Sequence, residues 1–324
     1  MNPMSFSAKD ILGLFSLALI HAFAVSTASL DIMIDQDEGF SAILRILYTG
    51  SLACTLLVLG FISRIVNIRR MAVIEALLPF PLVAASGIVV AVSLSGEVPM
   101  PLFFGAWAAL GAANGCVLVR LGMFFSTLDR PKAFMFAAVA LLIAGVVLAI
   151  IIGMGQASGM FVTLLLLAAS AAMSSFTPLP TLDRNTVKLK ESRFPLELIS
   201  SYVGSDRKST FFVIMFFYCV AFGYCEFGPP QQSAQIAFQP IAVSALLAGV
   251  VAVLYVRITR AQSDLFLAQW GLLALLVVGV AMPMTAEHSL ILGSIAFILI
   301  SVGFSCYDMS NWCALYEVSQ KENP

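Results

Sequence analysis

The sequence predicts an all-α polytopic membrane protein of about ten transmembrane helices, and three observations carry that prediction. Hydrophobic residues make up 60% of the 324-residue chain and charged residues only 11%, whereas a soluble domain carries roughly 25% charged residues. The mean hydropathy is +0.98. The apolar residues form uninterrupted runs of about twenty, the length at which a helix spans a bilayer. Continuous rather than alternating runs exclude a β-barrel.

Ten such runs follow one another along the chain. The expected spans are 11–30, 40–62, 71–94, 101–122, 133–153, 159–178, 209–227, 238–257, 265–284 and 289–307. The first run has a rival interpretation, because Lys9, the apolar residues and Ala22-Phe23-Ala24 resemble a signal peptide. We favour a retained span, since apolar sequence continues to Leu30. Pro79 and Pro81 lie inside the third run and predict a kink there.

Charged residues concentrate between the sixth and seventh runs. The segment 181–208 holds ten of the thirty-five charged residues, six of them Lys or Arg. Lys and Arg are retained on the cytoplasmic side of membrane proteins, and the loops expected outside contain neither. We therefore expect a plasma (inner) membrane protein with both termini cytoplasmic. The expected domains are a first membrane half at 1–178, a cytoplasmic loop at 179–208, a second half at 209–308 and a cytoplasmic tail at 309–324.

The layout of six helices, a charged loop and further helices resembles the major facilitator superfamily. A second likeness lies after the second run, in Gly60-Phe-Ile-Ser-Arg64-Ile-Val-Asn67-Ile-Arg69-Arg70. Its glycine and basic residues are similar to that superfamily's loop motif, although the acidic residue and the second glycine are missing. The resemblance implies a two-half bundle, and with ten of twelve helices it implies a C-terminally incomplete one.

A narrower resemblance rests on the Phe-rich seventh run, Phe211 to Tyr224. It is similar to the membrane regions that precede LuxR-type helix-turn-helix domains in actinobacterial regulators. The resemblance implies a bundle that senses a ligand rather than carries it. The tail is too short for a helix-turn-helix module, so no nucleic-acid binding by this chain is expected. A secondary transporter of a small, largely apolar molecule is the alternative, and a subunit whose bundle a partner or oligomer completes is a third possibility.

Ionisable side chains inside spans are costly and are therefore candidates for function. His21 lies near the middle of the first run. It is either a proton-coupled or ligand-contacting group, or a neutral side chain bonded to the hydroxyl of Ser26 or Ser16, which we favour. Arg45 lies near the outer end of the second run. It either pairs with the acidic residues that precede it or binds an anion, and we favour the pairing.

Charged residues also lie at the expected cytoplasmic ends of the spans. Glu75 is expected to pair with Arg64, Arg69 or Arg70 and to brace an inner gate. Arg120 is expected to reach lipid headgroups.

Further candidates are polar residues near helix breaks and small-residue motifs. Pro229 and Pro230 must end the seventh run. Tyr224, Glu226 and Gln231 lie beside this break, which is either a plain turn or a binding site. Gly111-Ala-Ala-Asn114-Gly115 permits close helix approach, within the bundle rather than between copies, and Asn114 is a candidate for lining a cavity.

Enzyme chemistry is not expected. Only two histidines are present, and no metalloprotease, phosphate-loop or nucleophile-elbow motif occurs. The six cysteines lack metal-site and redox spacings and are expected to be buried. We expect no metal and no cofactor, and the partners expected are the lipid bilayer and a small-molecule ligand.

Overall fold

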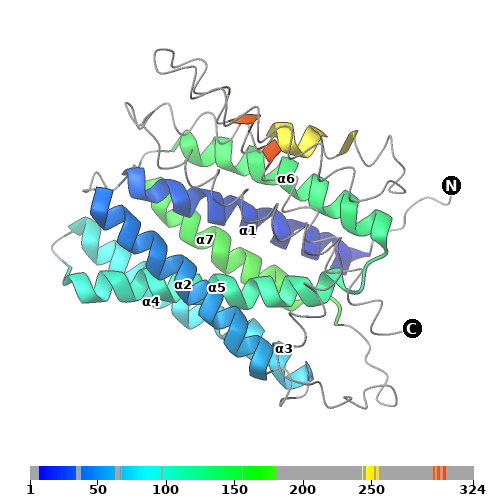
Figure 1. The fold of residues 1–324 in the computed structure, drawn as a ribbon, viewed down its shortest axis with the longest axis horizontal. Helices are drawn as coiled ribbons and strands as arrows, with labels where there is room; N and C mark the ends of the chain where they lie inside the picture. Colours follow the sequence, from blue (N-terminus) through cyan, green and yellow to red (C-terminus); the bar gives the residue numbers. More distant parts are fainter. Residues whose placement is uncertain are drawn as a thin grey trace, which may run out of the picture.

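A computed structural model describes residues 7–33, 38–62, 66, 68–95, 98–154 and 156–179, together with scattered positions between 243 and 303. Within these residues the secondary structure is helical throughout. The helices are α1 (Ala8–Met33), α2 (Glu38–Ile62), α3 (Ile68–Leu77), α4 (Pro79–Ser95), α5 (Met100–Phe125), α6 (Arg130–Ile152) and α7 (Gln156–Ser175). Figure 1 shows these helices lying side by side as one bundle.

Six helices of the described part are long and apolar enough to cross a membrane. They coincide with the first six expected spans, and the third of them, Arg69–Ser93, joins α3 and α4. Helices suit a bilayer because they satisfy every backbone hydrogen bond within the segment. The described residues thus confirm an all-helical fold with six candidate membrane-spanning helices, whereas the count of ten and the facilitator-like layout stay predictions. The central loop and most of the four later spans lie outside the described residues.

The third span is interrupted where the prolines predict a kink. α3 ends at Leu77 and α4 begins at Pro79. Proline lacks the N–H that an interior helix position donates, so neither Pro79 nor Pro81 can continue the backbone ladder. Leu78 still donates its N–H to the carbonyl of Ile74 over 2.9 Å. The span is therefore interrupted at a single residue, Leu78.

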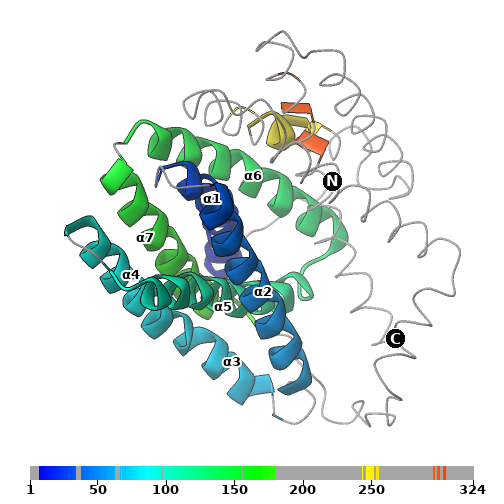
Figure 2. The same ribbon diagram turned by 60° about the vertical axis from the view of Figure 1, so that its left-hand side comes forward.

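Two helices organise the packing. α5 packs against α2 and α4, and α1 packs against α6 and α7. α4 also packs against α7, and α1 against α5. Figure 2 shows α5 between α2 and α4, with α6 and α7 on the other side of the bundle. Helices that are distant in sequence thereby enclose one core.

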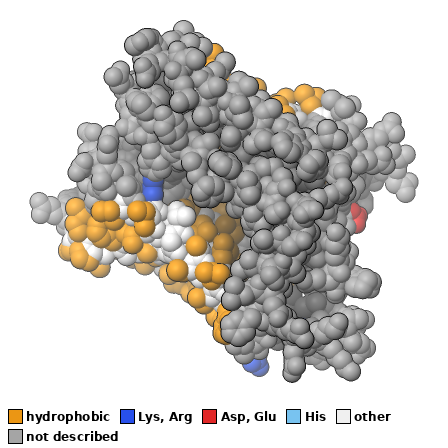
Figure 3. Space-filling model, viewed as in Figure 1, with side chains coloured by type: hydrophobic (Ala, Val, Ile, Leu, Met, Phe, Trp, Pro, Cys, Tyr) orange, Lys and Arg blue, Asp and Glu red, His pale blue; other side chains and the backbone are white. Residues whose placement is uncertain are grey.

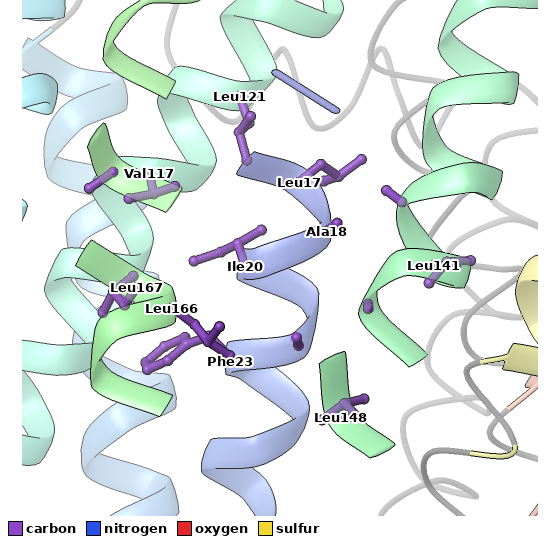
Figure 4. Close-up of a cluster of buried hydrophobic side chains, with 14 of the residues drawn as sticks. Leu17, Ala18, Ile20, Phe23, Val117, Leu121, Leu141, Leu148, Leu166 and Leu167 are labelled. Carbon is purple, nitrogen blue, oxygen red and sulfur yellow. The ribbon is translucent and has the colours of Figure 1, made fainter. Parts of the chain in front are cut away.

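That core surrounds α1. In Figure 4, side chains of α1 point toward side chains of α5, α6 and α7; the labelled members are Leu17, Ala18, Ile20, Phe23, Val117, Leu121, Leu141, Leu148, Leu166 and Leu167. Aromatic rings add specific contacts. Phe124 meets Phe136 edge to face at a centroid distance of 6.2 Å, a preferred geometry. Lipid is as apolar as these side chains, so close packing rather than hydrophobic transfer holds such helices together.

Small residues set how closely the helices approach. A Cβ built on Gly111 would lie within 3.0 Å of the Tyr48 backbone on α2, and one on Gly115 would lie 3.0 Å from the Cβ of Thr55. The prediction that this motif packs inside the bundle is confirmed. Gly145 of α6 meets Leu246 in the same way, with a built Cβ 2.8 Å from the Leu246 nitrogen.

The described surface is largely apolar. In Figure 3 hydrophobic side chains cover most of the part that is coloured by type, and Lys, Arg, Asp and Glu are isolated. α2 is the least buried span, and Ile46, Leu57 and Phe61 on it are 70%, 74% and 64% exposed. Such a surface suits lipid rather than water.

Candidate functional site

The end of the bundle at which α2 and α5 end and α3 begins carries the clearest cluster of buried charge. The charge rule predicts that this end faces the cytoplasm, and we call it the inner end. Arg120, in the penultimate turn of α5, is only 4% exposed. Its Nε donates to the carbonyl of Ser174 over 3.1 Å. Its Nη2 donates to the carbonyls of Ser175 at 3.4 Å and Thr177 at 2.8 Å.

Those three carbonyls stand where α7 ends. The last carbonyls of a helix have no intrahelical partner, and a cation is favourable there because the helix dipole is negative at that end. Arg120 therefore caps α7 from α5. The expectation that Arg120 reaches out to lipid headgroups is wrong, because backbone carbonyls at the end of α7, which no sequence pattern reveals, hold the guanidinium inside the bundle.

Glu75 on α3 is the other member of this cluster. Its side chain is 1% exposed, and neither carboxyl oxygen has a hydrogen-bond partner. Arg120 acts on it electrostatically, without a hydrogen bond or an ion pair within 4.0 Å among the described residues. Arg69 and Arg70 are exposed, and Arg64 lies outside the described residues. The expected pairing of Glu75 with these three arginines thus stays a prediction.

A carboxylate buried without a hydrogen bond is unusual, because burial of a charged group costs several kcal/mol unless partners compensate it. A conformational change that brings Glu75 and Arg120 into contact, or a proton that neutralises Glu75, would remove that cost. The inner end therefore contains a group whose energy depends on the position of α3 relative to α5.

A cavity of about 320 Å³ opens beside this cluster. It is lined by Arg69, Ala72, Val73, Ala76, Leu77, Arg120, Ser175 and Leu179. Residues of α3, α5 and the end of α7 thus meet there, and the two arginines face one space.

Asn114 lies between α5 and α2 rather than on an open surface. It is 3% exposed, and its Nδ2 donates to the hydroxyl of Tyr48. Its Oδ1 has no hydrogen-bond partner. The hydrogen bond adds a polar contact to the close approach that Gly111 and Gly115 allow. Asn114 therefore remains a candidate ligand contact through its spare oxygen.

His21 is half-buried near the middle of α1. The hydroxyls that the sequence suggested as its partners bond elsewhere. Ser16 on α1 donates its Oγ to the carbonyl of Ser170 on α7 over 2.9 Å, and Ser170 returns an Oγ bond to the Ser16 carbonyl over 2.8 Å. Ser26 bonds the carbonyl of Ala22. The two serines between α1 and α7 form a reciprocal clasp that sequence analysis missed.

A second contact at the inner end secures the start of α1. The Oγ of Ser7 accepts the N–H of Asp10 over 3.1 Å, and the Asp10 carboxylate accepts the N–H of Ser7 over 3.0 Å. This is a capping box, which satisfies two unpaired donors of the first turn. Lys132 of α6 pairs with the same carboxylate at 3.0 Å. The Ser7 to Asp10 spacing offered a signal that the sequence reading did not use.

Of the remaining candidate site residues, one lies on α2 and three lie outside the described residues. Arg45 is half-buried on α2, and the acidic side chains expected to pair with it are not described. Tyr224, Glu226 and Gln231 lie outside the described residues. Among the cysteines, Cys116 is buried as expected, whereas Cys54 is exposed on the apolar face of α2. A free thiol is apolar enough to face lipid, so Cys54 does not need protein around it.

No protein-family model matches the sequence, and no curated protein matches it. What the fold defines is therefore an α-helical chain with six described helices suited to crossing a membrane, consistent with an integral membrane protein.

Proposed function

We propose that the chain is a facilitator-like plasma membrane protein that binds a small, largely apolar molecule and senses it. The observation that carries this proposal is the cap that Arg120 places on the end of α7. Residues 179–208, the expected cytoplasmic loop, follow that cap directly. A ligand that moves α5 would therefore change how the loop leaves the membrane.

The helix packing supports a facilitator-like arrangement. The first three spans are α1, α2 and α3–α4, and the next three are α5, α6 and α7. If each span is exchanged for its counterpart, α1 corresponds to α5, α2 to α6 and the α3–α4 span to α7. The α2–α5 contact then corresponds to the α6–α1 contact, and the α1–α7 contact to the α5–α4 contact. Three antiparallel spans per set place the two sets in opposite orientations, and such inverted repeats occur within each half of facilitator transporters.

The same symmetry favours a second candidate function, secondary transport of a small, largely apolar molecule. Inverted repeats underlie the rocking of one helix set against the other in transporters. The buried carboxylate of Glu75 would serve there as a proton-dependent element of the inner gate. The two functions differ in whether the molecule crosses the membrane.

The first experiment distinguishes sensing from transport and uses the full chain in proteoliposomes. A panel of small apolar compounds is screened for those that raise its melting temperature. For each such compound, uptake under a proton gradient and the rate of trypsin cleavage within the Lys- and Arg-rich segment 181–208 are measured. Sensing predicts an altered cleavage rate without uptake, whereas gradient-driven uptake would contradict it and support transport.

An Arg120→Gln variant tests the coupling step. If the cap transmits the signal, the compound still raises the melting temperature of this variant but no longer alters cleavage. Arg70→Gln is the matched control, because Arg70 is exposed and is not among the groups that bond α7. An unchanged cleavage response in Arg120→Gln would remove Arg120 from the mechanism.

The orientation proposed for the chain has its own check. In inside-out vesicles the 181–208 segment should be cut by added trypsin, and in right-side-out cells it should be protected. Cleavage from outside would contradict the cytoplasmic placement of the loop and of the inner end.

A further inference from the structure

Glu75 is a carboxyl group that the described part of the fold leaves without a bonding partner. Its side chain is 1% exposed, and neither of its oxygens has a hydrogen-bond partner. One turn earlier on α3, Met71 packs with Leu59 of α2 and Cys116 of α5 in a buried apolar cluster. A carboxyl group buried in this way takes up a proton rather than remain charged, because nothing compensates the charge.

The charged and titratable groups around Glu75 come from α5 and from α3 itself. On α5, Arg120 and the thiol of Cys116 both interact with it electrostatically. The other described helices beside α3, which are α4, α7 and the last turns of α2 (residues 55–62), contain no titratable side chain. Arg69 and Arg70, at the start of α3, are exposed. Among the described residues, Arg120 is therefore the buried cation that can compensate a charged Glu75.

Arg120 is bonded elsewhere in this conformation. Its Nε donates to the carbonyl of Ser174, and its Nη2 donates to the carbonyl of Thr177. It makes no hydrogen bond with Glu75. A carboxylate is a stronger acceptor for a guanidinium than a neutral carbonyl is, because both partners are charged. One guanidinium thus has two competing sets of acceptors, and the charge on Glu75 decides which set is the stronger.

The cavity of about 320 Å³ gives the inner end access to the surroundings of Glu75. Ala72 and Ala76, which flank Glu75 on α3, line this cavity together with Arg120, although Glu75 itself does not. Water that enters the cavity therefore reaches the residues next to the carboxyl group, and a proton that leaves Glu75 has an acceptor nearby.

We infer that Glu75 is a proton-binding site and that its proton controls the cap on α7. In the conformation described, the carboxyl group is a neutral acid and Arg120 bonds α7. When the proton leaves, the O–H bond breaks, its electron pair stays on the carboxylate, and water at the inner end accepts the proton. Arg120 then pairs with the carboxylate and releases the α7 carbonyls. The effect on the segment after α7 rests on the proposed function of the cap, whereas the proton site does not.

The first test detects the proton by infrared difference spectroscopy on the full chain in lipid vesicles, between acid and alkaline buffer. A dry, protonated carboxyl group should give a carbonyl band that persists at neutral pH, where exposed carboxyl groups are ionised. Glu75→Gln should remove this band, and it should fold because its side chain resembles the neutral acid. Asp129→Asn should keep the band and is the matched control, since Asp129 is exposed at the start of α6.

The second test follows the cap through the rate of trypsin cleavage within 181–208, in detergent and without added ligand. The rate for the unaltered chain is divided by the rate for Glu75→Gln at the same pH, so that the pH dependence of trypsin cancels. This ratio should be close to unity in mildly acid buffer. In alkaline buffer it should rise about tenfold, the population change expected when one charge-assisted hydrogen bond is released.

A persistent band that Glu75→Gln removes, together with a ratio that rises with pH, would support the inference. The absence of such a band in the unaltered chain, or its survival in Glu75→Gln, would overturn the proton site. A ratio that stays at unity at every pH would overturn control of the cap by the proton. No ligand is added in either test, so these outcomes are independent of whether the chain senses or transports a small molecule.

Discussion

Two helix interfaces of this bundle bring backbones close together by different means. At the α2–α5 interface, Gly111 and Gly115 leave room for the α2 backbone around Tyr48 and for Thr55. At the α1–α7 interface, Ser16 and Ser170 meet and exchange hydrogen bonds with each other's carbonyls. The first interface depends on the absence of atoms, and the second on the presence of two hydroxyls.

This difference indicates how well each interface tolerates a substitution. A backbone cannot move aside as a flexible side chain can, so an added Cβ at Gly111 must separate the helices. A hydroxyl that is removed leaves only a small void, because the carbonyl it bonded lies inside a helix and still accepts the N–H four residues later. In membranes such interhelical hydrogen bonds average about 0.6 kcal/mol and reach about 1.7 kcal/mol. The glycine interface should therefore be the less tolerant one.

The largest expected effect follows from Gly111→Ala. Its methyl group would lie within 3.0 Å of the Tyr48 backbone, and overpacking costs about 1–3 kcal/mol, or more where nothing can relax. We expect a loss of about 3 kcal/mol in the free energy of unfolding, measured by denaturation in mixed micelles.

The matched control for this variant is Gly105→Ala on the same helix. A Cβ there meets nothing within 4 Å, and alanine is favoured over glycine in a helix by about 1 kcal/mol. Gly105→Ala should be neutral or stabilising. Equal destabilisation by both variants would show that the close contact with α2 is not what makes Gly111 intolerant of a methyl group.

The intermediate effect concerns the serine clasp. Ser16→Ala and Ser170→Ala should each lower the free energy of unfolding by about 1 kcal/mol. The double variant should lose less than the sum of the two, because both hydroxyls belong to one contact. Ser93→Ala is the control, since Ser93 bonds only the carbonyl of Val90 in its own helix. Additive losses would mean that the two serines act independently.

The smallest expected effect concerns the polar contact at the α2–α5 interface. Asn114 and Tyr48 share one hydrogen bond there, and replacing both partners with apolar residues of similar shape is nearly neutral. The Tyr48→Phe/Asn114→Leu variant should change the free energy of unfolding by about 0.5 kcal/mol or less. A loss comparable with Gly111→Ala would show that the polar contact and not steric fit dominates the interface.

The sequence predicted the spans well because bilayer thickness fixes the length of each apolar run. It also predicted the role of Gly111 and Gly115, since small residues at a spacing of four have one principal use in a bundle. It did not predict the partners of Arg120. Those partners are backbone carbonyls of a helix that begins more than thirty residues later, and every residue type has a carbonyl.

The candidate site was predictable only in part for the same reason. Glu75 was recognisable as a costly buried charge, but its position opposite Arg120 depends on how α3 packs near α5. The Ser16 and Ser170 hydroxyls are common residue types in apolar helices. Only the crossing of α1 and α7 distinguishes them from serines that bond their own helix, such as Ser93, whose Oγ donates to the carbonyl of Val90.

The break at Leu78 gives the third span two mechanically separate parts. Pro79 and Pro81 supply no N–H, so the carbonyls of Glu75 and Leu77 lose the donors that would otherwise stiffen the rod across the join. The short helix α3, with Arg69 near one end and Glu75 near the other, thus packs against α5 and α7 as a rod separate from α4.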